Sequence, residues 1–204
     1  MPRPDVNSAL ARSLLRDGAI KRLSVLRAAG VHPATLSRLE AQGAVLKLGR
    51  GLYQASNADL TANHDLAEAS LKAPTGVICL TSALAFHGLT DQMPARVWVA
   101  IGQSDHALRA GSGVKIVRFN ERLLTDGVER HMIEGVSVKI FGVAKTIADC
   151  FRHRNTVGLT IALEGLQQAL AQRKATPGAL SEAFANGRVT TIAHPYLDAL
   201  TANG

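Results

Sequence analysis

The sequence predicts an α+β protein in which an N-terminal winged helix-turn-helix (residues 1–57) is followed by a mixed α+β C-terminal domain (residues 58–204). Three observations predict this fold class. Two helical segments carrying leucines are separated by a glycine and followed by a strand–Gly-Arg-Gly–strand pattern. Short runs of alternating apolar and polar residues then indicate a small sheet. A stripe of leucines beyond them indicates a helical C-terminal section.

The first 57 residues are predicted to hold three helices, over residues 7–16, 21–29 and 33–42. Their apolar residues recur at helical spacing, as in Leu23 and Leu26 or Leu36 and Leu39. Glycines follow the second and third segments, and a glycine just past a helix adopts the left-handed conformation at little cost. Pro33 suits the first turn of the third helix, where its missing N–H costs nothing. Val31 is expected to fill the space between the second and third helices.

The third helix has a polar face that is typical of a DNA-reading helix. If Leu36 and Leu39 point inward, we expect Thr35, Arg38 and Gln42 to project together on the opposite side, with Ser37 beside them. Such side chains donate to phosphates and base edges. Residues 44–55 then predict a hairpin whose tight Gly49-Arg50-Gly51 turn exposes a cation at its tip, where it can lie along a phosphate backbone or enter the minor groove.

The charge of the chain is concentrated in this first segment. Residues 1–57 contain nine Lys or Arg and three Asp or Glu, a net of +6, whereas residues 58–204 have a net of only +1. Such an imbalance concerns the partners of a protein rather than its fold. Leucine-rich helices and Gly-Arg-Gly turns also occur in ordinary small domains. Together with the segregated charge, however, they indicate binding to double-stranded DNA.

The second part of the chain predicts a few strands followed by helices. Thr81 is expected to cap a short helix, and alternation in three of the strands predicts a sheet with one wetter face. A polar, glycine-rich loop is expected between two strands, over residues 102–113. The predicted strands are residues 77–80, 96–101, 114–119 and 136–141; the predicted helices are residues 62–72, 82–87, 143–154, a longer one that carries Leu159, Leu163, Leu166 and Leu170, and short ones at 179–185 and 195–200.

Composition excludes several classes of protein. The two cysteines, Cys79 and Cys150, lie in apolar surroundings and are expected to be buried free thiols rather than a disulfide framework or a zinc site. The few aromatic residues argue against stacking platforms for single-stranded nucleic acids. Without a long apolar run, no membrane span is expected, and we expect a cytoplasmic protein.

We find no complete catalytic set in the sequence. Residues 101–105 resemble a nucleotidyltransferase Gly-Ser turn only faintly, because no Asp-x-Asp follows. Phosphate-cradling and zinc-binding motifs are also missing. His87 is expected to be a structural histidine, and Asp149 a buried, hydrogen-bonded organiser of its helix. We therefore predict no enzymatic activity, no cofactor and no metal. The alternative is a nucleic-acid-processing enzyme that uses Asp149, Asp105 or His87 and is targeted by the winged helix.

The order of these parts resembles the AbiEi family of antitoxin transcriptional regulators from type IV (AbiE) toxin–antitoxin systems. The resemblance rests on Arg50-Gly51-Leu52-Tyr53 at the wing, on ICLTSALAFHGL at residues 78–89, on a strand pair, and on VAKTIADCF at residues 143–151. It implies that the first domain binds operator repeats and represses its own operon. It also implies that the second domain acts against a nucleotidyltransferase-like toxin.

The expected function is therefore that of a sequence-specific DNA-binding repressor of antitoxin type. The expected partners are double-stranded operator DNA, with inverted repeats, and a nucleotidyltransferase-like toxin. A solitary regulator without a toxin and a protein-interaction module remain alternatives, and the oligomeric state is not predicted. The residues expected to contact DNA are Lys21, Thr35, Ser37, Arg38, Gln42, Lys47 and Arg50.

Overall fold

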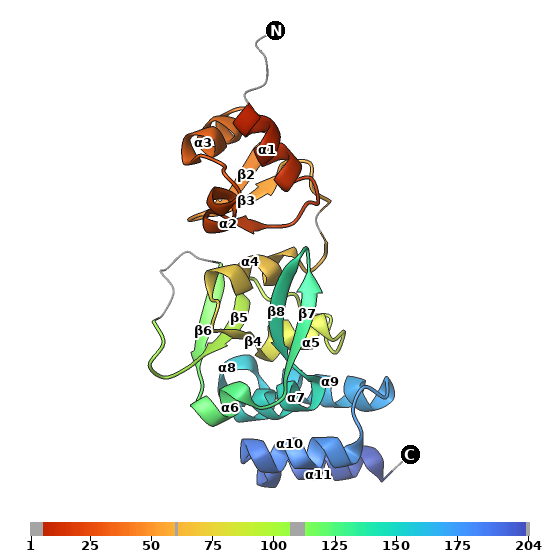
Figure 1. Cartoon of the computed structure of the whole chain (residues 1–204). Helices are drawn as coiled ribbons and strands as arrows, with labels where there is room; N and C mark the ends of the chain where they lie inside the picture. Colours follow the sequence, from red (N-terminus) through yellow and green to blue (C-terminus); the bar gives the residue numbers. More distant parts are fainter. Residues whose placement is uncertain (1–5, 60, 107–112, 203–204) are drawn as a thin grey trace. The chain divides into compact units, whose positions relative to one another are not determined.

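The computed structural model describes residues 6–59, 61–106 and 113–202 (Figure 1). The chain divides into two compact units, and the mixed α+β class with an N-terminal winged helix is confirmed. The first unit comprises residues up to Lys72 together with Met132–Ser137; the second comprises Ala73–His131 and Val138–Gly204. The sequence-based boundary after residue 57 differs from this division, and an independently folding domain of residues 1–57 stays a prediction.

The first unit is built from three helices and a three-stranded antiparallel sheet of order β1-β3-β2, followed by one more helix (Figure 1). Its elements are α1 (Val6–Leu14), β1 (Lys21–Arg22), α2 (Leu23–Ala28), α3 (Pro33–Ala41), β2 (Val45–Gly49), β3 (Leu52–Ala55) and α4 (His64–Lys72). The predicted helices and hairpin are confirmed, apart from shifts of one or two residues at several ends.

The start of the second helix is a correction. Lys21 and Arg22 form β1 and pair with Tyr53 and Leu52 of β3, so α2 begins only at Leu23. The Leu23 N–H donates to the carbonyl of Gly51, at 2.7 Å, which fixes the strand-to-helix step against the wing. A two-residue strand is too short to produce a visible alternation in the sequence, and its pairing with β3 is a non-local interaction.

The core of the first unit contains apolar residues that the helical spacing predicted to be buried. Val31 is 2% exposed between α2 and α3, as expected. Gly30 and Gly43 have φ values of +96° and +67°, so both helices end in the left-handed conformation that glycine adopts most readily. The buried core comprises Ala11, Leu15, Leu26, Val31, Leu36, Leu39, Val45 and Tyr53.

The carboxylate of Glu134 connects several residues of the first unit. Glu134 lies at the tip of the hairpin between β7 (Val128–Ile133) and β8 (Val136–Phe141). It accepts hydrogen bonds from Gln54 Nε2 (3.1 Å) and from the backbone N–H of Thr61 (2.9 Å), and it lies 2.8 Å from His64 Nδ1. Burial alone would raise its pKa, but the bonds from Thr61 and His64 outweigh that effect, and the pKa of Glu134 is lowered.

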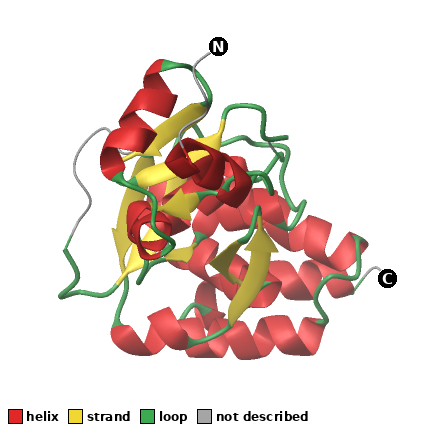
Figure 2. Cartoon of the chain, turned by 45° about the horizontal axis from the view of Figure 1, so that its top comes forward, coloured by secondary structure: helices red, strands yellow, loops and turns green. Residues whose placement is uncertain are grey.

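The second unit is a five-stranded mixed sheet with helices gathered beside it (Figures 1 and 2). The strand order is β6-β5-β4-β8-β7; β4 runs antiparallel to β5 and parallel to β8, and β5 is parallel to β6. The remaining elements are β4 (Val77–Ile78), α5 (Leu80–Phe86), β5 (Val97–Ile101), β6 (Val114–Arg118), α6 (Glu121–Thr125), α7 (Val143–Arg152), α8 (Arg154–Val157), α9 (Leu159–Ala171), α10 (Pro177–Gly187) and α11 (Thr190–Thr201).

Two sequence-based expectations about this unit need correction, and two elements were not expected. Thr81 is not the helix cap, because α5 begins at Leu80 and its N-cap is Cys79. All five residues of β5 are buried, so this strand has no wetter face; β4 and β6 flank it. The sequence also gave no sign of α6 or β7. The predicted loop at residues 102–113 lies partly outside the described residues.

The core of the second unit confirms the predicted stripe of α9 in part: Leu166 is fully buried, Leu163 and Leu170 are half-buried, and Leu159 is exposed. Phe141, Phe151 and Phe184 are fully buried together with Leu166 of α9, and α7 packs against α5, α9 and α10. Both cysteines are buried free thiols, as expected. Among the helices that the structure describes, none is long and apolar enough to cross a membrane.

Candidate nucleic-acid interface

The outer face of α3 is exposed, but it does not contain every residue that the helical pattern assigned to it. Ser37, Arg38 and Gln42 are exposed. Thr35, in contrast, is only 6% exposed. It lies next to Leu36 and one helical turn before Leu39, on the side of α3 that is packed into the unit. Its assignment to the exposed face is therefore corrected.

The side chain of Arg38 has a partner inside the protein. Its Nη2 donates to the hydroxyl of Ser8 in α1, at 2.7 Å. This bond turns part of the guanidinium toward α1, although the residue as a whole is exposed. The Ser37 hydroxyl donates to the carbonyl of Pro33 at 3.3 Å. Of the three exposed candidates, Gln42 follows α3 directly as its C-cap residue.

The turn between α2 and α3 is held by a residue that the sequence analysis did not single out. Asn7 Nδ2 donates to the carbonyl of Gly30, at 2.8 Å, and Asn7 Oδ1 accepts from the backbone N–H of His32, at 2.9 Å. These two bonds fix the turn on both sides of Val31. The only sequence signal for this role was an asparagine at the start of a helix, which is common and unspecific.

The wing presents two exposed cations, as the sequence predicted. Lys47 and Arg50 are both exposed. The pairing of β2 with β3 shifts register between Lys47 and Gly49, where a β-bulge interrupts the ladder. Gly51 has a φ of +72°, which lets the two-residue turn close. A bulge bends the strand and re-aims its side chains, so here it sets the direction of the wing.

Other basic residues of the first unit are engaged in the fold. Lys21 is half-buried and pairs with Asp17 at 2.6 Å, which offsets its charge. Arg22 donates through Nη2 to the carbonyl of Leu71. Arg27, in the last turn of α2, is in contrast exposed, and it was not among the residues predicted to contact DNA.

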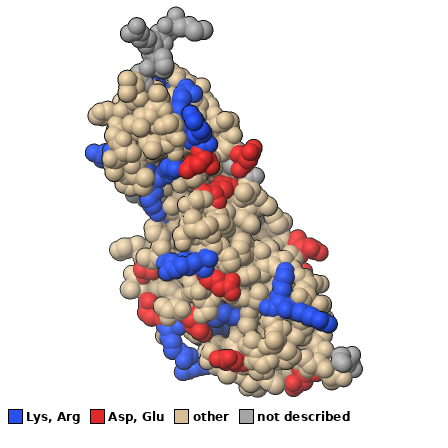
Figure 3. All heavy atoms as spheres, turned by 45° about the vertical axis from the view of Figure 1, so that its right-hand side comes forward, with Lys and Arg blue, Asp and Glu red and all other residues tan. Residues whose placement is uncertain are grey.

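Most of the net positive charge of the chain lies in the winged helix, residues 1–57. On the face drawn in Figure 3, Lys and Arg side chains lie on the first unit together with some Asp and Glu side chains, next to wide areas without charged residues. The second unit shows basic and acidic side chains side by side on that face. Residues 1–57 have a net charge of +6 and the remainder of the sequence has a net of +1. The electrostatic attraction for a polyanion is therefore concentrated in the winged helix.

Asp149, His87 and Asp105 are the residues that the alternative, an enzyme, would use. Each of them has its own hydrogen-bond partners within the protein. Asp149 is fully buried and pairs through both oxygens with Lys145 Nζ, at 2.6 Å, so its predicted organising role is confirmed. The Nε2 of His87 donates to the carbonyl of Phe141 at 2.8 Å, and burial lowers the pKa of the ring. Asp105 accepts from the N–H of Gly102 and from the hydroxyl of Thr75, each at 3.1 Å. Within the described ranges, no His, Cys, Asp and Glu side chains group in a way that could hold a metal ion.

The comparisons with known proteins agree with this architecture. Residues 22–56, which run from the end of β1 through the wing, match a family described as "Transcriptional regulator, AbiEi antitoxin". The resemblance noted from the sequence is thus confirmed over this segment, and the family is regulatory rather than catalytic. No curated protein matches the chain.

A solved structure supports the fold over the whole chain. The crystal structure of the RV2827C protein from Mycobacterium tuberculosis superimposes with a TM-score of 0.65 and 14% sequence identity. The match covers 98% of this chain and 82% of that one. At this level of identity the likeness concerns the fold alone. Both units of the present chain therefore have a counterpart in an experimentally determined structure.

Proposed function

We propose that this protein is a sequence-specific DNA-binding transcriptional repressor with the architecture of an AbiEi antitoxin. The observation that carries the proposal is the basic winged helix, whose residues 22–56 match that regulator family. The exposed face of α3, the exposed wing cations and the net charge of +6 in residues 1–57 all favour DNA as the partner of the winged helix.

In the proposed binding mode α3 enters the major groove and the wing lies along the phosphate backbone. Ser37, Arg38 and Gln42 are exposed on or directly after α3 and present donors to bases and phosphates. Lys47 and Arg50 would neutralise phosphates beside the groove. Lys21 and Thr35 fit a direct contact less well, because one is paired with Asp17 and the other is buried.

The wing is tested by fluorescence anisotropy with DNA from the region directly upstream of the coding sequence. Arg50→Ala should weaken binding at low salt, and the loss should shrink as salt rises, because a phosphate contact acts through released counterions. Arg130→Ala removes an equal charge from an exposed site in β7 and should leave affinity unchanged. Full affinity of Arg50→Ala at low salt would reject the wing contact.

The contribution of α3 is tested by comparing the upstream fragment with a scrambled fragment of equal length and composition. Arg38→Ala should cost about 1–3 kcal/mol on the upstream fragment and less on the scrambled one, if Arg38 reads a base. Ser8→Ala removes the internal partner of Arg38 but keeps the cation. An equal loss in both variants would mean that the bond between α1 and α3 matters, rather than a contact with DNA.

Autorepression and antitoxin activity form the second half of the proposal. If a nucleotidyltransferase-like gene lies beside this one, its induction alone should arrest growth of the host, and co-expression of this protein should restore growth. A reporter gene driven by the upstream region should be repressed by the protein and released by Arg50→Ala. Repression without rescue would make the protein a solitary regulator.

A further inference from the structure

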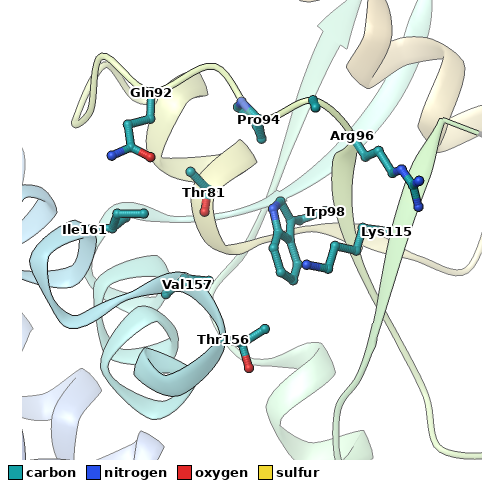
Figure 4. A pocket seen from close by; sticks show the side chains of 10 residues that line it. Thr81, Gln92, Pro94, Arg96, Trp98, Lys115, Thr156, Val157 and Ile161 are labelled. Atoms are coloured by element: carbon teal, nitrogen blue, oxygen red, sulfur yellow. The ribbon is translucent and has the colours of Figure 1, made fainter.

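The second unit contains a pocket that the proposed DNA-binding role does not use. Its volume is about 400 Å³, a size typical of sites for small organic ligands. It lies between the start of α5, strands β5 and β6, and the start of α9 (Figure 4). The residues that matter for its chemistry are Thr81, Trp98, Lys115, Val157 and Ile161.

The pocket is lined by a threonine hydroxyl that has no partner within the described part of the protein. Thr81 is 5% exposed, and the described residues make no hydrogen bond with its side chain. The hydroxyl of its neighbour Ser82, in contrast, accepts a hydrogen bond from the backbone N–H of Trp98, at 2.9 Å. In Figure 4 the Thr81 side chain points into the space between Trp98 and Val157. Because this hydroxyl borders the pocket and is not paired with another described residue, it is free to bond to a ligand there.

The backbone holds Thr81 in this position under strain. Leu80, the residue before it, is fully buried and has a φ of +49°, which is unusual for a bulky side chain. Strand β4 ends at Ile78 and α5 begins at Leu80. Cys79 is therefore the N-cap residue, and Thr81 already lies in the first turn of α5. Strained residues of this kind cluster at binding sites, where the surrounding structure keeps them in place.

One wall of the pocket is cationic. The Nζ of Lys115 lies 3.8 Å from the ring centroid of Trp98, in a cation–π contact at the edge of the pocket. The exposed side chain of Arg96 adds a second cation at the rim (Figure 4). No Asp or Glu occurs among the described residues that line the pocket. The site therefore favours an anionic group.

The opposite wall is apolar and faces an aromatic ring. Val157 at the end of α8 and Ile161 in the first turn of α9 lie across the pocket from Trp98 and Lys115 (Figure 4). Pro94 closes the apolar part. A flat hydrophobic body fits between such walls, with its acidic end toward Lys115 and Thr81.

We propose that this pocket binds a small aromatic anion. The acidic group of the ligand pairs with Lys115 and accepts a hydrogen bond from the Thr81 hydroxyl, and its planar part lies between Trp98 and Val157. A nucleoside monophosphate and an aryl carboxylate share this chemistry. The proposal is independent of DNA binding, since every residue that it uses belongs to the second unit.

The tryptophan itself provides the test, because Trp98 is the only tryptophan of the chain. The intact protein is titrated with AMP, adenosine, benzoate, benzamide and inorganic phosphate while tryptophan fluorescence is recorded. We expect a saturable change with AMP or with benzoate, and the stronger of the two identifies the source of the ligand. The neutral analogues and phosphate alone should bind at least about tenfold more weakly, since each lacks one half of the recognised chemistry.

Three variants assign the response to the pocket. Lys115→Gln should weaken binding of the responding anion about tenfold or more, and Thr81→Val, which keeps the shape of the side chain, should weaken it severalfold. Arg130→Gln removes one positive charge from an exposed site in β7 that does not line the pocket, and it should leave binding unchanged. Circular dichroism and the unfolding midpoint show whether each variant is folded.

Three outcomes would overturn the proposal. The first is no saturable change with either anion at millimolar concentration. The second is equal binding of adenosine and AMP, or of benzamide and benzoate, which would remove the anionic requirement. The third is unchanged affinity in folded Lys115→Gln protein.

Discussion

Lys145 and Asp149 form an ion pair inside the second unit, one helical turn apart on α7. The side chain of Lys145 is 6% exposed and that of Asp149 is fully buried. The Lys145 Nζ also lies 4.6 Å from the ring centroid of Phe141 and 5.2 Å from that of Phe119. Burial raises the pKa of Asp149 to about 6, although Lys145 opposes the shift. Two charges removed from water depend on each other, because either one alone would lack compensation.

Removal of one partner should therefore be much more costly than removal of both. Asp149→Asn leaves the lysine buried without its counter-charge and should lower the free energy of unfolding by about 3–5 kcal/mol. The double variant Lys145→Met/Asp149→Leu should lose much less, since apolar side chains of similar volume avoid the desolvation cost. Urea unfolding measures both, and a double variant as unstable as the single one would contradict this account.

Glu134 predicts a dependence of stability on pH. Because its folded-state pKa is lowered, the carboxylate contributes stability fully above the unfolded pKa of about 4.3. That contribution is lost as the pH falls through the lower, folded pKa. Unfolding free energies between about pH 5 and pH 3 should therefore fall more steeply for the wild type than for Glu134→Gln. Glu182→Gln, an exposed glutamate of α10, should keep the wild-type slope.

At the scale of elements, α11 contains a proline in its interior. Pro195 lies six residues into Thr190–Thr201 and is exposed. Its ring removes the N–H that would bond to the carbonyl of Thr191, and an interior proline costs up to about 3 kcal/mol relative to alanine. Pro195→Ala should therefore raise the unfolding midpoint in urea. An unchanged or lower midpoint would mean that the restriction of the unfolded chain by proline is the larger effect.

The elements that the sequence predicted well are those with a local signal. The α3 helix, the Gly49-Arg50-Gly51 turn and the leucine-rich α9 each combine a periodic pattern with a terminating or turn residue. Strand β1 and the mixed sheet order of the second unit depend on partners far away in the sequence. Strand β7 has three consecutive polar residues, Glu129, Arg130 and His131, and no apolar alternation. Their formation follows from tertiary pairing, which a single sequence does not display.

The same distinction applies to the candidate interface. The spacing of Leu36 and Leu39 correctly gave an exposed face with Ser37 and Gln42. It could not reveal that Thr35 is packed into the unit or that Arg38 bonds to Ser8, because both depend on how α1 and α3 pack. The pocket of the second unit was not predicted at all. Its key residue, Thr81, was predicted as a capping threonine and lies in the stretch at residues 78–89 that carries the family resemblance, and neither feature indicated a pocket.

At the scale of the whole molecule, the segregation of charge predicts a moderate salt dependence of DNA binding. If Arg38, Lys47 and Arg50 each neutralise one phosphate, the logarithm of the binding constant should fall with the logarithm of salt concentration with a slope of about −3 per monomer. Arg50→Ala should reduce the slope by about one. Anisotropy titrations at several salt concentrations give the slope, and a value near zero would remove DNA as the electrostatic partner.

The two buried cysteines have a practical consequence for such measurements. Cys79 and Cys150 are both fully buried, and burial raises the pKa of each thiol. Because the thiolate is the reactive form, neither should react with maleimide dyes or photo-cross-linkers in the native protein. A single cysteine introduced at Gln42 or at Arg50 would then carry the only accessible label. The native chain is thus already suited to site-directed cross-linking that maps which base pairs each position approaches.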